Sequence, residues 1–159
     1  MTSDELIALL ELEPLAGEGG YFRQTYRSLR VVSDAAVARP LGTCIYYLLT
    51  PESFSAFHRL SADEIFHFYL GDPVEHVRLA LSGTTITTLG QNVEKGECVQ
   101  LIVPAGVWQA ARLMPGGSWA LMGTTMCPGF ADEDHIIGKR DELIASFPEY
   151  KELITELTR

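Results

Sequence analysis

Long apolar runs, paired cysteines and an excess of positive charge are all missing from this sequence. No apolar stretch approaches the roughly 20 residues that a transmembrane helix needs, so no membrane-spanning helix is predicted. The N-terminal segment MTSDELIALLELEP is acidic and lacks the features of a signal peptide, which makes the cytoplasm the expected compartment. Disorder is not expected either, because 47% of the residues are hydrophobic and only 21% are charged.

Cysteine and basic residues are too few for several classes of protein. Cys44, Cys98 and Cys127 lie far apart with no CxxC pair, so reduced thiols are expected rather than a secreted disulfide framework. Lysine and arginine number 12 against 21 aspartate and glutamate, a formal net charge of −9. This charge repels phosphate backbones and anionic lipids, so neither nucleic acid nor membrane is an expected partner. A small polar molecule, bound at a site with its own local charges, is compatible with it.

The two ends of the chain have helical patterns. Ser3 is a suitable N-cap for a helix over about residues 3–12, whose leucines share one face. Beyond residue 138, leucine and isoleucine recur among charged residues, and Pro148 divides the segment into two amphipathic stretches. We therefore expect one N-terminal helix and helical segments at the C-terminus.

Between these ends the periodicity is that of strands. YFRQTYRS alternates, TCIYYLLT is dense in β-branched and aromatic residues, and about seven further short runs follow, most of them bounded by turn formers. A loop is expected around VSDAAVARP. No long helical pattern interrupts the strands, so the sequence predicts a single all-β barrel or sandwich domain over residues 1–159.

The segment FSAFHRLSADEIFHFYLGDP is the densest candidate for a site. Side chains two residues apart on a strand share a face, so Glu64, Phe66 and Phe68 lie together and His67 faces away. If His58 on the preceding strand also turns inward, it joins Glu64 in an aromatic-lined interior. A carboxylate there must be paired, protonated or bound to a cation. A purely structural hydrogen bond between histidine and glutamate is the alternative.

A second candidate segment, GECVQLIVPAGVWQAA, ends in a Trp-Gln strand opening. An inward Gln109 would need a polar partner, and the neighbouring Trp108 has the opposite parity and suits the rim or the core. In CPGF, Phe130 is expected to fold onto the barrel, as a lid or as a ligand contact. His76 in an outer strand and His135 in a polar loop are expected to take no part in the site.

These two segments resemble the two cupin motifs. The first motif has His-x-His followed by Glu and Gly, and the second has Pro-x-Gly followed by His. The matching positions here are His58, Glu64, Gly71, Pro104 and Gly106. Leu60 stands where the second histidine of the first motif belongs, and Gln109 stands at the histidine of the second. Two of the four metal ligands that the motifs imply are therefore absent.

A longer resemblance covers nearly the whole chain. The order GGYFRQTYRS, TCIYYLLTPESFSAFHRLSADEIFHFYLGDP, VPAGVWQAA, CPGFADED and a final FPE is similar to the DUF985 group, also called the cupin-5 family. This resemblance implies a double-stranded β-helix (jelly-roll) barrel, usually a homodimer, similar in architecture to dTDP-sugar 3,5-epimerases and germin-like proteins. The group has no established function, so the resemblance implies a fold and not a reaction. TCIYYLLT, apolar on both faces, also favours a homodimer, unless terminal helices cover it.

For such a barrel, an enzyme acting on a small polar metabolite, such as a sugar or nucleotide-sugar, is the first hypothesis. It resembles the epimerase-like barrels, which work without metal. His58 would abstract a proton, Glu64 would orient it, and Tyr47 or Tyr69 would return one. Under this first hypothesis we expect the protein to use no cofactor.

Two other hypotheses stay open. In a metal-dependent cupin, His58, Glu64 and Gln109 would hold Mn, Fe, Ni or Zn, although metal enzymes usually have at least three good protein ligands. In a non-catalytic binding module, an aromatic wall would hold the ligand and the polar residues would fix its polar end. The residues expected to form that wall are Phe66, Phe68 and Trp108.

Overall fold

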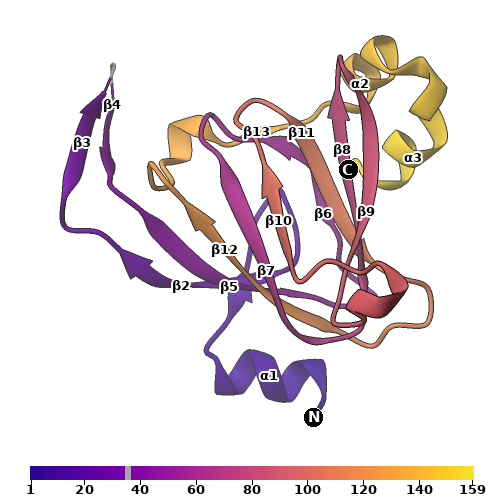
Figure 1. The fold of residues 1–159 in the computed structure, drawn as a ribbon, viewed down its shortest axis with the longest axis horizontal. Helices are drawn as coiled ribbons and strands as arrows, with labels where there is room; N and C mark the ends of the chain where they lie inside the picture. The colour runs from indigo at the N-terminus through magenta and orange to yellow at the C-terminus, as the bar shows by residue number, and fades with distance from the viewer. Residues whose placement is uncertain (35–36) are drawn as a thin grey trace.

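The computed structural model describes residues 1–34 and 37–159. Its main body is two antiparallel sheets that face each other as a barrel (Figure 1). The six-stranded sheet has the order β1 (Glu13–Pro14), β2 (Tyr21–Arg27), β5 (Thr43–Leu49), β12 (Ala120–Met126), β7 (Glu64–Gly71) and β10 (Gln100–Val103). The five-stranded sheet has the order β13 (Ile136–Ile137), β6 (Ser55–Arg59), β11 (Trp108–Leu113), β8 (Val74–Ala80) and β9 (Gly83–Leu89). The predicted all-β barrel is confirmed.

Helices occupy both ends of the chain, as predicted. The N-terminal α1 (Ser3–Leu9) is capped by Thr2 rather than Ser3, in a capping box with Glu5, and is shorter than expected because Glu11 adopts a positive φ of 53°. The C-terminal helices are α2 (Arg140–Ser146) and α3 (Lys151–Glu156). Short 3₁₀ turns complete the list, at η1 (Val93–Lys95), η2 (Asp132–Asp134) and η3 (Pro148–Tyr150). None of the described helices is long and apolar enough to cross a membrane.

The segment expected to be a loop around VSDAAVARP is instead a hairpin. β3 (Val31–Asp34) pairs with β4 (Val37–Pro40) and projects away from the barrel (Figure 1), while residues 35–36 of this segment lie outside the described residues. The valines Val31, Val32 and Val37 suit a short strand, but the small and polar residues between them are typical of a loop.

The apolar side chains form two main layers. Inward-facing residues of β5, β7, β10, β11 and β12 fill the space between the sheets. On the outer face of the five-stranded sheet, α2 and α3 pack against β6, β8 and β11. The strict alternation of side chains along each strand therefore decides which residues meet the interior and which meet the C-terminal helices.

Candidate functional site

A cavity of about 830 Å³ lies between the sheets. Its wall includes residues of β1, β2, β5, β7 and β12 of one sheet and of β6 of the other, together with the turn after β1 and the segment after β12. Four titratable side chains in this wall interact electrostatically with one another. We call Glu18, His58, Glu64 and His135 the polar cluster.

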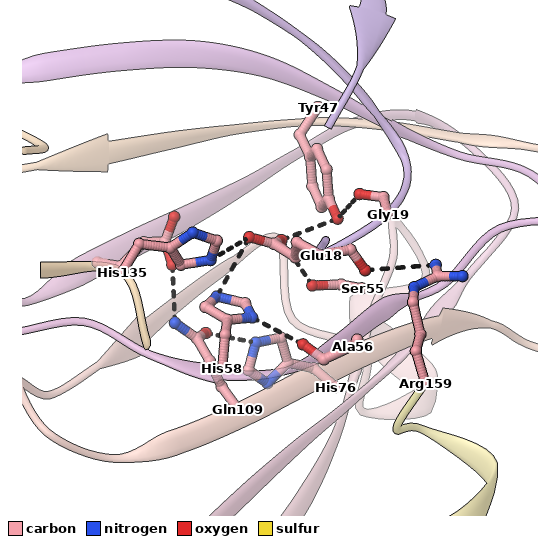
Figure 2. Close-up of polar contacts among 11 residues, drawn as sticks. Glu18, Gly19, Tyr47, Ser55, Ala56, His58, His76, Gln109, His135 and Arg159 are labelled. Carbon is pink, nitrogen blue, oxygen red and sulfur yellow. Dashed lines mark hydrogen bonds and ion pairs between the residues drawn. The ribbon is translucent and has the colours of Figure 1, made fainter. Parts of the chain in front are cut away.

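Glu18 is the residue on which most contacts of the polar cluster converge (Figure 2). Its Oε1 accepts hydrogen bonds from the Tyr47 hydroxyl at 2.9 Å and from Ser55 Oγ at 2.8 Å. Its Oε2 faces two imidazoles, with His135 Nε2 at 3.1 Å and His58 Nε2 at 3.7 Å. The two carboxylate oxygens thus have different surroundings: one is held by hydroxyl donors and the other faces nitrogen atoms.

The glycine-rich turn before β2 is what brings Glu18 into the barrel. Gly19 and Gly20 adopt positive φ values of 105° and 75°. A Cβ at Gly20 would come within 2.8 Å of the Tyr47 ring, and one at Gly19 would collide with the Phe54 carbonyl oxygen. Only glycine combines this conformation with so close an approach. The turn is then fixed to β6 by a 2.8 Å hydrogen bond from the Ala56 amide to the Glu18 carbonyl.

The surroundings of Glu18 stabilise its charged form. Burial alone would raise its pKa, but the charges of His58 and His135 and the hydrogen bond from Ser55 outweigh burial and lower the pKa to about 2. The same burial, together with the Glu18 charge, raises the pKa of Tyr47 well above its usual value. Glu18 is therefore an anion at neutral pH, and Tyr47 is a neutral phenol that donates to it.

The two histidines of the cluster are oriented differently. His58 Nδ1 lies 2.9 Å from the Ala56 carbonyl oxygen, which can only accept, so Nδ1 carries a hydrogen and Nε2 is the atom that faces Glu18. His135 comes from the segment after β12, and its ring lies edge-on to that of His58 with centroids 5.2 Å apart. Close contact with the Glu18 carboxylate raises the pKa of His135.

A second series of hydrogen-bonded polar side chains lies behind Glu64. Gln109 Nε2 donates to Glu64 Oε2 at 2.8 Å, and Gln109 Oε1 lies 3.2 Å from His76 Nε2. Burial raises the pKa of Glu64 by more than the charge of His58 lowers it. Burial also lowers the pKa of His76, to about 3, so this histidine is neutral and its Nε2–H can donate to Gln109.

The structure separates the predicted site residues into three groups. His58, Glu64, Tyr47 and Phe66 line the cavity. Gln109 is buried behind Glu64 and joins no part of the cavity wall, and Phe68 has the predicted parity but packs deeper, in the core. Trp108 lies on the outer face of the five-stranded sheet, with the Arg59 guanidinium 4.7 Å from its ring centroid.

The positions of the other histidines and tyrosines agree only in part with the predictions from the sequence. His67 faces away from the cavity, as parity predicts, and bonds to Thr125 Oγ1 at 3.1 Å. His135 and His76 were expected to be bystanders, yet His135 contacts Glu18 and His76 holds Gln109. Of the two tyrosines considered for proton return, Tyr47 lines the cavity and Tyr69 does not.

Glu18 is the member of the polar cluster that the sequence analysis did not single out at all. It stands among three glycines in AGEGG, a tract expected only to end the N-terminal helix. Clustered glycines also signal a close backbone approach, and an acidic residue inside such a cluster was the available clue.

The donor set that the cupin motifs imply for a metal is incomplete here. Leu60 lines the cavity but has no donor atom. Both polar atoms of the Gln109 amide are already used, one by Glu64 and the other by His76. Glu64 and His58 are the two remaining members, and two ligands are too few for an ordinary protein metal site.

Comparison with known proteins identifies similar chains. The family model described as Cupin superfamily (DUF985) matches residues 4–137. An uncharacterized protein of Saccharomyces cerevisiae is 33% identical over 143 residues, which are 79% of this chain and 71% of that one. A hypothetical protein from Leishmania major has a structure with a TM-score of 0.93 at 28% identity, covering 99% of each chain. A Shewanella oneidensis protein of known structure has a TM-score of 0.91 at 32% identity, covering 100% of this chain and 98% of that one.

Proposed function

This chain belongs to the cupin superfamily, in the DUF985 family, and from that premise we propose that its barrel binds a small polar metabolite at the polar cluster. The observation that carries the proposal is the cavity of about 830 Å³, into which two carboxylates and two imidazoles converge. Ligand sites are typically cavities of roughly 300–1,000 Å³ with apolar walls and a few convergent polar groups. The apolar residues of the wall include Phe22, Ile45, Phe66, Met126 and Phe130.

The chemistry of the polar cluster favours a hydroxyl-rich ligand, such as a sugar or a nucleotide-sugar. The ionised Glu18 accepts hydrogen bonds, while burial raises the pKa of Glu64 and so favours its protonated form, which donates as well as accepts. Hydroxyl groups donate and accept in the same way, so one ligand can satisfy both carboxyl groups. The apolar wall suits the C–H faces of a sugar ring.

An isomerase- or epimerase-like proton transfer on the bound metabolite is the second candidate function. It is supported by two neighbouring carboxyl groups whose pKa values are shifted in opposite directions, a pattern typical of acid–base sites. Glu64 is the proton carrier in this proposal, because it lines the cavity and burial raises its pKa, which favours the proton-bound form of its carboxyl group. Tyr47 is a positioning residue, since its hydroxyl is committed to Glu18 and to the Gly19 carbonyl.

Binding is tested first. Mass spectrometry of small molecules released from the purified protein is combined with calorimetric titration of free sugars, sugar phosphates and nucleotide-sugars. We expect saturable binding of at least one class, weakened at least about 10-fold by Glu64→Gln, because the amide nitrogen that replaces one carboxyl oxygen cannot accept a hydrogen bond. The matched control is Glu52→Gln, which removes an exposed carboxylate outside the cavity and should bind as wild type does. No released molecule and no saturable binding across the panel would refute the proposal.

Proton transfer is tested on the ligand that binds. In D₂O, the wild type should exchange one carbon-bound hydrogen of the ligand for deuterium. Proton NMR measures this exchange as the loss of that hydrogen's signal. Glu64→Gln should lower the exchange rate by about 10² at saturating ligand, the usual contribution of one acid–base group. Exchange at wild-type rate in this variant would remove Glu64 from the reaction, and no exchange in the wild type would reject an isomerase while leaving binding intact.

A further inference from the structure

We propose that Glu18, His58 and His135 bind a divalent transition-metal ion. This ligand set shares only His58 with the two cupin motifs. The other two ligands come from outside those motifs, one from the glycine-rich turn before β2 and one from the segment after β12. Metal binding by these residues does not depend on the proposed metabolite, whereas the role given below to the open coordination positions does.

The three donor atoms are close enough to share one ion. Glu18 Oε2, His58 Nε2 and His135 Nε2 all lie within 4.8 Å of one another. Ligand atoms around an ion at about 2.1 Å lie roughly 3–3.5 Å apart, for bond angles between right-angled and tetrahedral. The distances from Glu18 Oε2, 3.1 Å to His135 and 3.7 Å to His58, need only small side-chain movements to reach this range.

The groups behind these donors have the arrangement that orients metal ligands. A ligating histidine usually donates its second ring N–H to a carbonyl or carboxylate, as His58 Nδ1 does to Ala56. A ligating carboxylate is likewise held by hydrogen bonds, as Glu18 Oε1 is by Tyr47 and Ser55. Both residues therefore keep one atom fixed by the protein and present the other, Oε2 or Nε2, to the shared point.

Neither nitrogen atom at that point has a hydrogen-bond partner among the residues that the structure describes. His135 Nε2 is buried and makes no hydrogen bond, because its contact with Glu18 Oε2 has ion-pair distance without hydrogen-bond geometry. The 3.7 Å separation of His58 Nε2 from the same oxygen is also too long for a hydrogen bond. A buried nitrogen without a hydrogen bond, as His135 Nε2 is, calls for an explanation, and a cation between the three atoms supplies one. The competing arrangement is a protonated imidazole paired with Glu18.

Two imidazoles and one carboxylate suit first-row divalent ions such as Zn²⁺, Fe²⁺, Co²⁺ and Ni²⁺, and leave coordination positions open. All three ligands line the cavity, so the open positions face it. A metabolite with two neighbouring oxygen atoms could chelate the ion there. Glu64, in the same wall, is then placed beside the bound ligand rather than on the metal.

Metal binding is tested on the full-length chain after treatment with a chelator and without any metabolite. Titration with Co²⁺, followed by visible absorption and calorimetry, should give one ion per chain and the spectrum of a nitrogen–oxygen site. Glu18→Gln and His135→Gln should each weaken binding by at least about 100-fold, since even outer contacts of metal sites contribute about 10- to 100-fold. Tyr47→Phe, which loses only an outer contact, should weaken it about 10-fold.

The matched control is His67→Gln, which removes an imidazole on the opposite face of β7 and should bind Co²⁺ as the wild type does. Circular dichroism and thermal unfolding in chelator show whether each variant is folded, and Glu18→Gln keeps an acceptor for Tyr47 and Ser55. Absence of one-to-one binding, or binding insensitive to both ligand variants, would overturn the metal site and indicate the histidine–carboxylate ion pair. Metabolite titration of chelated protein is a separate measurement, so the two proposals can fail independently.

Discussion

Lowering the pH from 8 to 5 is expected to destabilise the fold through His76. This side chain is 1% exposed, and its ring packs edge-on against Phe66 with centroids 4.8 Å apart. One ring nitrogen contacts Gln109, and the other, Nδ1, is buried and has no hydrogen-bond partner within residues 1–34 and 37–159. A proton added to Nδ1 would place an unsolvated charge in this interior, which is why burial lowers the pKa of His76 to about 3.

The size of the effect follows from the two protonation equilibria. In the unfolded chain the pKa returns to its usual 6.5, so below that pH the unfolded state binds a proton that the folded state does not. The stability contribution of neutral His76 is therefore complete above pH 6.5 and is lost as the pH falls toward 3. Each pH unit in this window costs about 1.4 kcal/mol, so the loss at pH 5 is about 2 kcal/mol.

Urea unfolding of the wild type and of His76→Gln at several pH values between 8 and 5 measures this loss. Glutamine keeps an N–H that can reach Gln109 but does not titrate. The wild type should lose about 2 kcal/mol more than the variant over this range, because the other histidines are common to both and cancel. His67→Gln, at a half-buried position outside the cavity, should instead follow the wild type. A stability difference between wild type and His76→Gln that is the same at pH 8 and pH 5 would refute the reasoning.

Three further outcomes are expected. Gly19→Ala should lower the unfolding free energy by more than about 2 kcal/mol in urea titrations, because its φ of 105° and the Phe54 carbonyl both oppose a Cβ; wild-type stability would contradict this. Gln109→Leu should cost about 2–4 kcal/mol, since Glu64 and His76 lose their shared partner, and a neutral result would show that they find others. Light scattering should give a homodimer mass, because large apolar side chains are exposed around β2 and the β3–β4 hairpin; a monomer would exclude it.

The all-β architecture was predictable because its signals are local. Alternation along each strand and turn formers between strands are short-range properties, and so are the amphipathic repeats of α2 and α3. The β3–β4 hairpin was not predicted, because its small and polar residues have only a weak local preference for a strand. Pairing with a neighbouring strand, which the residues themselves do not show, is what makes that segment extended.

Strand parity also carried part of the site. It brought His58, Glu64 and Phe66 to one interior and separated Trp108 from Gln109, because successive side chains on a strand must point to opposite faces. Parity determines which face of the sheet a side chain lies on, but not how far along the barrel interior it lies. Phe68 shares the face of Glu64 and still belongs to the packed core rather than to the cavity.

The sequence by itself determined the barrel, its helical ends and the inward direction of His58 and Glu64, since each of these depends on a repeat of two or of 3.6 residues. Only the tertiary structure decided that Glu18 and His135 meet His58. Glu18 and His135 lie in connecting segments without a regular period and are separated by more than a hundred residues of chain. Closure of the two sheets brings such segments together, and no local pattern records which loops will face each other across the barrel.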